Sequence, residues 1–355
     1  MPITSITITR PLDAGLSLRD NGEMRDVVGF SAKRFGEAII TPDLESPVTT
    51  VAQARAYRER ILAALPKGST FNPLMTLCLT DRTTTSEIAS ATHHRDLITA
   101  VKLYPISATN NPALGVTSMS EIRPVLDMME REGLPLFLVH DKIIDPTVDV
   151  FDQEKVFIHQ VLLLLTRYHP ELCIGFNATT KWGVHFAKVT PNVVATITAH
   201  HLLENCSALF RGGINPHNFC LPVLNREEHR QALLLAATSG DPKYFFGSDS
   251  APQGRRNKEA ACGRPGCFTA HAALELVATA FEEYRPEALI DGSFERFMSS
   301  NGRAFYKLDL NALEQNKETI TLVRDSWRIR DDYEFGSDIV VPFWAGRTLE
   351  WRVKK

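Results

Sequence analysis

Short β-rich runs alternate with longer amphipathic stretches along almost the whole of this 355-residue chain. The runs typical of strands are residues 6–9, 38–41, 71–79, 98–103, 134–140, 172–176, 193–198 and 244–247. Apolar residues at helical spacing predict helices over residues 24–35, 51–65, 118–133, 150–169, 226–237 and 269–283, the third starting at a capping box of Ser118 and Glu121. A strand followed by a helix about eight times indicates a parallel sheet with crossover helices, and eight such units close into a (β/α)8 barrel. We therefore expect an α/β protein, a TIM barrel forming a single domain over residues 1–355, with added strands at 320–323 and 348–353 in a small C-terminal extension.

Composition and charge exclude several classes of protein. The chain has 39 basic and 42 acidic residues, and its lysines and arginines are scattered, so neither a nucleic-acid partner nor an anionic membrane surface is indicated. Its apolar runs are far shorter than the roughly 20 residues of a membrane span, and its N-terminus does not resemble a secretory signal. The six cysteines are expected to be reduced thiols. These features predict a cytoplasmic protein that acts on a small molecule.

In a barrel of this kind the working residues follow the C-terminal ends of the strands. That rule selects a short set of polar side chains: Arg19, Asp20, Asp43, Lys102, His140, Asn177, His200, His201 and Asp249. His200 and His201 follow an expected strand. Because neighbouring strand residues face opposite ways, we expect at most one of the two to serve as a metal ligand, and a hydrogen-bonded structural histidine is the alternative.

Seven segments carry a resemblance to a known family. They read RPLDAGLSLRD at 10–20, PDLESPVTT at 42–50, VKLYP at 101–105, LVH at 138–140, GSDSAP at 247–252, CGRPGCF at 262–268 and VPFWAGRTLEW at 341–351. In this order they resemble the dihydroorotases, specifically the single-function bacterial and fungal branch of the amidohydrolase superfamily. The resemblance implies an amidohydrolase-type TIM barrel and a homodimer.

The resemblance also implies a metal centre, from which this sequence departs. In the family, two zinc ions bridged by a carboxylated lysine activate a hydroxide that attacks a cyclic imide carbonyl. Lys102 matches the bridging lysine, His140 matches a histidine ligand, and Asp249 matches the aspartate that ligates metal and shuttles the proton. The family's other three metal histidines are replaced by Gly15, Ser17 and Asn177, which are absent or poor zinc donors. We therefore expect no bound metal, no cofactor and an unmodified Lys102, its ammonium paired with Asp249.

The substrate-binding positions are mixed. Arg19 matches the arginine that grips the substrate carboxylate, whereas Asp43 replaces its asparagine partner and Gln253 replaces a histidine. The remaining positions carried over from the family are the mobile-loop pair Thr109 and Asn110, and Leu221, whose backbone contacts the base ring. Since Asp43 puts a negative charge where the family binds one, we expect dihydroorotate to be repelled.

Three hypotheses about function remain open. The first is a metal-independent, non-hydrolytic enzyme of specialised metabolism that guides a cyclisation or rearrangement, such as a Diels–Alder closure, of a carbonyl-bearing small molecule. In it Lys102, Arg19 and Asp249 carry catalysis, because donors aimed at a carbonyl can activate it without hydrolysis. The second is a residual zinc-dependent cyclic amidohydrolase, and the third is an inactive homologue with a scaffold role. The vacated space at Gly15 and Ser17 favours the first.

Overall fold

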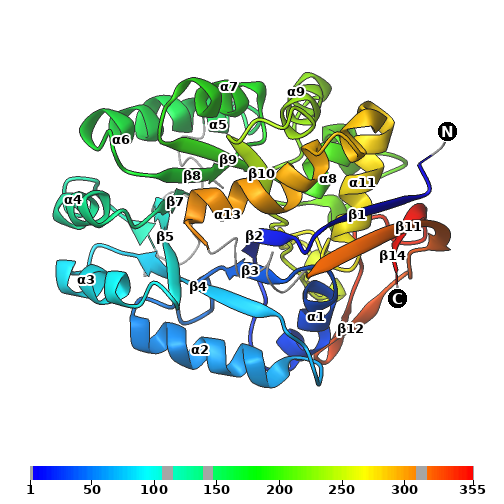
Figure 1. Ribbon diagram of the computed structural model, residues 1–355, viewed down its shortest axis with the longest axis horizontal. Coiled ribbons are helices and arrows are strands. Elements are labelled where there is room, and N and C mark those ends of the chain that lie inside the picture. The colour runs from blue at the N-terminus through cyan, green and yellow to red at the C-terminus, as the bar shows by residue number, and fades with distance from the viewer. Residues whose placement is uncertain (1–2, 106–114, 139–146, 309–317, 355) are drawn as a thin grey trace.

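Eight parallel strands form a nearly closed barrel in the computed structural model, which describes residues 3–105, 115–138, 147–308 and 318–354 (Figure 1). The barrel strands are β2 (Leu12–Leu16), β3 (Glu37–Ile40), β4 (Asn72–Leu79), β5 (Ile98–Pro105), β7 (Leu136–Leu138), β8 (Ile174–Asn177), β9 (Val193–Ile197) and β10 (Tyr244–Phe246). A parallel bridge between Leu16 and Ser250 joins β2 to the segment after β10. The short β6 (Gly115–Val116) pairs with the end of β5. The predicted (β/α)8 barrel is confirmed.

Helices cover the outside of the barrel. They are α1 (Asn21–Arg34), α2 (Val51–Ala64), α3 (Thr85–His93), α4 (Arg123–Glu132), α5 (Gln153–Phe157), α6 (Leu163–Tyr168), α7 (Lys181–Val189), α8 (Ala199–Leu203), α9 (Glu227–Ala237), α10 (Arg255–Lys258), α11 (Ala273–Tyr284), α12 (Ser293–Glu295) and α13 (Asn301–Tyr306). The expected helix over 150–169 is α5 and α6 joined by a π-helical turn. None of the described helices is long and apolar enough to cross a membrane.

Threonine caps set where several of these helices begin. Thr50 forms a reciprocal capping box with Gln53 at the start of α2, and Thr180 and Thr198 cap α7 and α8. The capping box predicted at Ser118 is wrong. Helix α4 begins at Arg123, and the Ser118 hydroxyl instead bonds within its own turn to Ser120 at 2.6 Å.

Apolar side chains pack in two layers. The larger cluster lies between the strands and the surrounding helices. This is expected for parallel strands, which helices cover on their outer face. A smaller cluster includes Leu12, Ile39, Leu74 and Phe245 of four barrel strands together with Tyr306 of α13. Helix α13 crosses one end of the barrel in Figure 1, so its aromatic residues close that end.

The predicted strand at 6–9 exists but belongs elsewhere. It is β1 (Ser5–Thr9), which pairs antiparallel with β11 (Thr319–Arg328), and β11 pairs in turn with β14 (Thr348–Val353). This three-stranded sheet and the hairpin of β12 (Tyr333–Phe335) and β13 (Asp338–Val340) make up the C-terminal extension. The first barrel strand is β2, which the sequence pattern did not separate from β1. Whether barrel and extension form a single domain stays a prediction.

Candidate active site

The C-terminal ends of the barrel strands surround a cavity of about 200 Å³, called here the mouth cavity. Of the twelve positions carried over from the family, nine line it: Gly15, Ser17, Arg19, Asp43, Lys102, Asn177, Leu221, Asp249 and Gln253. The other three, Thr109, Asn110 and His140, lie outside the described residues. The strand-end candidates Asp20, His200 and His201 do not line the mouth cavity. Sequence reasoning missed Tyr104, Phe137, Thr196 and Cys220, which also line it. Tyr104 could have been predicted from the sequence. Side chains two residues apart on a strand point the same way, so Tyr104 lies on the same face of β5 as Lys102.

Strand β2 brings the first pair of predicted residues to the mouth cavity. The Gly15 carbonyl accepts a hydrogen bond of 2.8 Å from the backbone N–H of Asp249, so position 15 lies beside the aspartate. A Cβ atom built at Gly15 would meet no atom within 4 Å. Ser17 is buried, and its hydroxyl is 2.8 Å from that of Thr41. The space expected at Gly15 is therefore present, whereas the Ser17 hydroxyl is already engaged.

A buried carboxyl group that the sequence did not single out supports this edge. Asp13 accepts hydrogen bonds from the Ser248 N–H at 2.8 Å, the Ser248 hydroxyl at 2.6 Å and the Gly15 N–H at 3.1 Å. These bonds tie β2 to the segment that carries Asp249. Burial raises the pKa of Asp13 to about 7, against the lowering effect of the Ser248 and Gly15 hydrogen bonds.

Lys102 and Asp249 stand on opposite sides of the same cavity. The Lys102 side chain is 9% exposed, and its ammonium lies 5.4 Å from the Tyr104 ring centre and 5.7 Å from that of Phe137. The pairing of the Lys102 ammonium with Asp249 that the sequence predicts stays a prediction. Asp249 has a φ of 42°, a left-handed conformation that is costly for a non-glycine residue and is often found at functional sites.

Arg19 and Asp43 lie where the mouth cavity opens into a wider outer cavity that both residues also line. The Arg19 Nε donates to the Pro252 carbonyl at 3.1 Å, and its own carbonyl accepts from the Tyr57 hydroxyl at 2.7 Å. Burial, and then the charge of Asp43, raise the pKa of Tyr57, which keeps it a hydroxyl donor. Gln253 lines the same opening. The cavity therefore carries a cation and an anion at its entrance.

The two-zinc centre that the resemblance implies does not fit this donor set. Position 15 carries no side chain, the Ser17 hydroxyl is used by Thr41, and Asn177 offers only an amide. Zinc in proteins is held by cysteine, histidine and carboxylate groups. Lys102 and Asp249 are thus the described remnants of that centre.

Relatives of this chain are found in bacteria and fungi. The dihydroorotase of Ralstonia nicotianae is 49% identical over 352 residues, which cover 99% of each chain. Among solved structures, dihydroorotase from Campylobacter jejuni is 32% identical with a TM-score of 0.85 over 99% of this chain and 98% of its own. The Saccharomyces cerevisiae dihydroorotase in complex with 5-fluoroorotic acid is 29% identical, with a TM-score of 0.87 over 99% of both chains. No protein-family model matches the sequence.

These relatives overturn the first hypothesis about function. A metal-independent enzyme of cyclisation or rearrangement in specialised metabolism is the wrong prediction, because full-length relatives at 49% identity are dihydroorotases. The prediction read the space at Gly15 and the surrounding donors as a pocket for a new ligand. That space is part of the barrel mouth. The donors line it because they follow the ends of the barrel strands, so their presence does not indicate a new ligand.

Proposed function

Because the chain belongs to the dihydroorotase family, we propose that it is a cyclic amidohydrolase, opening or closing the ring of dihydroorotate or a similar six-membered cyclic amide. The observation that carries the proposal is the meeting of Lys102, Asp249 and Arg19 in one cavity, in a chain 49% identical to a dihydroorotase over nearly its whole length. These side chains come from three separate places along the chain, and the fold alone brings them together.

Arg19 is the group that would bind a substrate carboxylate. Its Nε is occupied by the Pro252 carbonyl, which orients the guanidinium at the entrance of the cavity. No acceptor for its two terminal nitrogens is found in the part of the chain that the structure describes, so both can form a bidentate pair with a carboxylate. Asp43 at the same entrance weakens such binding by like-charge repulsion, which favours a substrate with less negative charge than dihydroorotate.

Lys102 and Asp249 would carry the chemical step. The Asp249 carboxylate takes a proton from a water whose oxygen attacks the ring carbonyl carbon. The Lys102 ammonium donates a hydrogen bond to the carbonyl oxygen as it becomes negatively charged. Collapse of the intermediate breaks the carbon–nitrogen bond of the ring, and Asp249 returns the proton to the leaving nitrogen. Ring closure is the same sequence in reverse.

The surroundings of Lys102 support this role. Its ammonium is nearly buried between two aromatic rings, where a charge acts on a neighbouring carbonyl more strongly than in water. The left-handed backbone at Asp249 and its N–H bond to the Gly15 carbonyl fix the main chain from which the carboxylate projects. Both groups are thus positioned before a substrate arrives.

The test measures ring opening and closing by chromatography, with L-dihydroorotate, a dihydropyrimidine lacking the carboxylate, and their ring-opened acids. The full chain is assayed as purified and with added zinc. Asp249→Asn and Lys102→Met should each slow turnover by roughly 10²-fold or more, because each removes a group that acts in the transition state. The exposed residues Asp96 and Lys188 provide matched controls, Asp96→Asn and Lys188→Met, which should leave turnover unchanged.

Two results would overturn the proposal. One is the absence of turnover for every cyclic amide when calorimetry shows that the compounds bind, which would indicate the inactive homologue. The other is turnover that survives both Asp249→Asn and Lys102→Met at the wild-type rate.

A further inference from the structure

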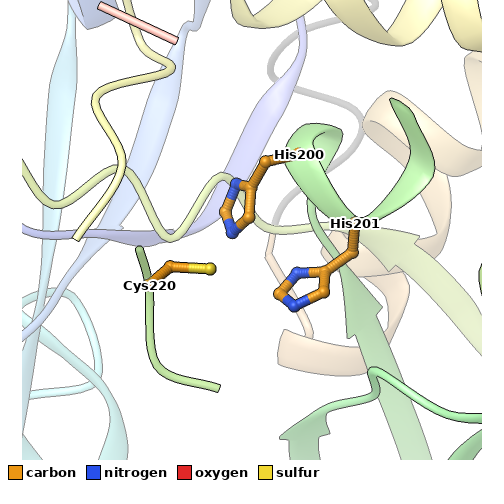
Figure 2. A group of neighbouring side chains, drawn as sticks. All are labelled: His200, His201 and Cys220. Atoms are coloured by element: carbon orange, nitrogen blue, oxygen red, sulfur yellow. The ribbon is translucent and has the colours of Figure 1, made fainter. Parts of the chain in front are cut away.

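Three buried side chains with metal-binding atoms gather beside the mouth cavity: His200, His201 and Cys220. One ligand atom from each lies within 4.8 Å of the others. Figure 2 shows the Cys220 sulfur and the His201 ring on either side of the His200 ring. The two histidines lie in the short helix α8, not on a strand, so the expectation that they face opposite ways is wrong. Cys220 also lines the mouth cavity.

His200 is a buried imidazole whose ring nitrogens lack a partner among the residues that the structure describes. Its side chain is 1% exposed, and within the described ranges neither ring nitrogen has a hydrogen-bond partner. A buried polar group left in this condition destabilises the folded protein. Burial, followed by the influence of His201 and Lys258, lowers the pKa of His200 well below its usual value, so the ring is neutral and has a lone pair to offer. A ligand at this position would remove this destabilisation.

Both ring nitrogens of His201 have hydrogen-bond partners, and a cation could replace one of them. Its Nδ1 is 2.7 Å from the Thr198 hydroxyl, and its Nε2 is 3.2 Å from the Val223 carbonyl. The bond to Val223 is long and can be exchanged for a bond to a cation. The bond to Thr198 would then fix the ring and its tautomer, as outer hydrogen bonds do in metal sites.

The sulfur side of the cluster has a second thiol and a buried cation. The Cys220 Sγ donates to the Pro222 carbonyl at 3.2 Å, and Cys220 and Cys267 are both buried. The contact between the two thiols lowers the pKa of Cys267, whereas the same contact, and then burial, raise the pKa of Cys220 well above its usual value. The ammonium of Lys258 acts to lower both. Lys258 is 2% exposed and donates to the Phe219 carbonyl at 2.7 Å and the Gly266 carbonyl at 3.0 Å. Its charge favours thiolates, the form in which cysteine binds metal, although it opposes a cation that lacks them.

We propose that His200, His201 and Cys220 bind a divalent ion of the zinc class, with Cys267 as the nearest further donor. Nitrogen and sulfur donors in this combination are those of tetrahedral zinc sites. Zinc–nitrogen bonds of about 2.0–2.1 Å and zinc–sulfur bonds of about 2.3 Å set donors roughly 3.3–3.8 Å apart, so the side chains need to close by about 1 Å. The ion would tie α8, which follows β9, to the segment that carries Leu221 into the mouth cavity. It would therefore hold one wall of that cavity.

The experiment uses the full chain, purified under reducing conditions and stripped with a chelator, then titrated with Zn²⁺ and separately with Co²⁺. Wild type should bind about one Zn²⁺ per chain, and its Co²⁺ form should show a thiolate-to-cobalt charge-transfer band. His200→Gln and Cys220→Ser should each lower Zn²⁺ affinity at least tenfold, and Cys220→Ser should weaken the band. The control variants His271→Gln and Cys173→Ser change a buried histidine and a free cysteine elsewhere and should leave both readouts unchanged.

The variant Asp249→Asn distinguishes this site from a metal bound in the mouth cavity near Lys102 and Asp249. It should leave the thiolate-to-cobalt band unchanged. The proposal fails if the Co²⁺ form has no thiolate band, or if His200→Gln and Cys220→Ser both bind Zn²⁺ as wild type does. Circular dichroism of each variant reports folding, and His200→Gln alone decides the matter if Cys220→Ser unfolds. Because the readouts are metal content and spectrum, the result is independent of the proposed hydrolysis.

Discussion

Glu154 on α5 is a buried carboxylate that holds the end of β8 beside the mouth cavity. Its Oε2 accepts from the Thr179 N–H at 2.7 Å and hydroxyl at 2.6 Å, and its Oε1 accepts from the Thr180 N–H at 3.2 Å and hydroxyl at 2.6 Å. Only Ala178 separates these two threonines from Asn177 in the sequence. We predict that Glu154→Gln destabilises the protein measurably even though it conserves shape.

The magnitude follows from the four hydrogen bonds. An amide keeps one acceptor oxygen and turns an NH₂ group toward the other pair of donors. The threonine hydroxyl there can rotate and accept, but the backbone N–H cannot. One charge-assisted bond is lost and a buried N–H is left unsatisfied, which costs about 2–3 kcal/mol.

Gly183 packs against Glu154 and provides a second test of its role. A Cβ atom at this position would overlap Glu154 Oε1 and lie 3.1 Å from its Cδ. Gly183→Ala should therefore be strongly destabilising in the wild-type background, despite alanine's better helix propensity of about 1 kcal/mol. In a Glu154→Ala background the overlap with the carboxylate disappears, and only the close contact with Ala178 Cβ at 3.2 Å remains. The double-mutant cycle should show a coupling of about 1–3 kcal/mol, with the second substitution cheaper after the first.

Urea unfolding followed by circular dichroism measures these values, and a shift of the midpoint at constant slope identifies a change in stability. The matched control is Glu121→Gln, because Glu121 is exposed and should contribute less than about 0.5 kcal/mol. Additive effects of Glu154→Ala and Gly183→Ala, or a Glu154→Gln protein as stable as the control, would refute the reasoning.

Two further predictions concern strand β2. Since the pKa of Asp13 is raised to about 7 in the native state from a usual value of 3.8, the native protein binds the proton more tightly, and the free energy of unfolding should fall as pH rises between about 4 and 7. The slope is at most about 1.4 kcal/mol per pH unit, and Asp13→Asn should flatten it in urea titrations at several pH values; an unchanged slope would show that Asp13 is not its source. Gly15→His should change the melting temperature by less than about 3 °C, because nothing lies within 4 Å of its Cβ, whereas Ser17→His should lower it more because the Ser17 side chain is buried against Thr41. Thermal melts in which Gly15→His is the worse of the two would contradict this.

Local patterns in the sequence determined the barrel and the general place of its site. Strand and helix periodicities repeat about eight times, and the parallel order of strands then forces polar residues at strand ends to meet at one edge. Lys102, Arg19, Asp43, Asn177 and Asp249 do line one cavity, as this rule predicts. Such features follow from the sequence because each depends on a short window and on a closure rule common to the fold.

Pairings between distant parts of the chain were decided only by the tertiary structure. Strand β1 reads like a barrel strand, but it pairs with β11 more than 300 residues away, and a period-two pattern is the same for either partner. The bond between Asp13 and Ser248, which supports the site, likewise joins residues 235 positions apart. No local window contains either contact.

The cluster at His200 shows the same limit at close range. The pattern placed both histidines at a strand end, with opposite faces, whereas Thr198 caps a short helix there and brings the two rings to 4.6 Å between centres. Cys220 then reaches them from a separate segment. Which donors meet is a property of distances between side chains, and those distances exist only once the helices, strands and loops have packed against one another.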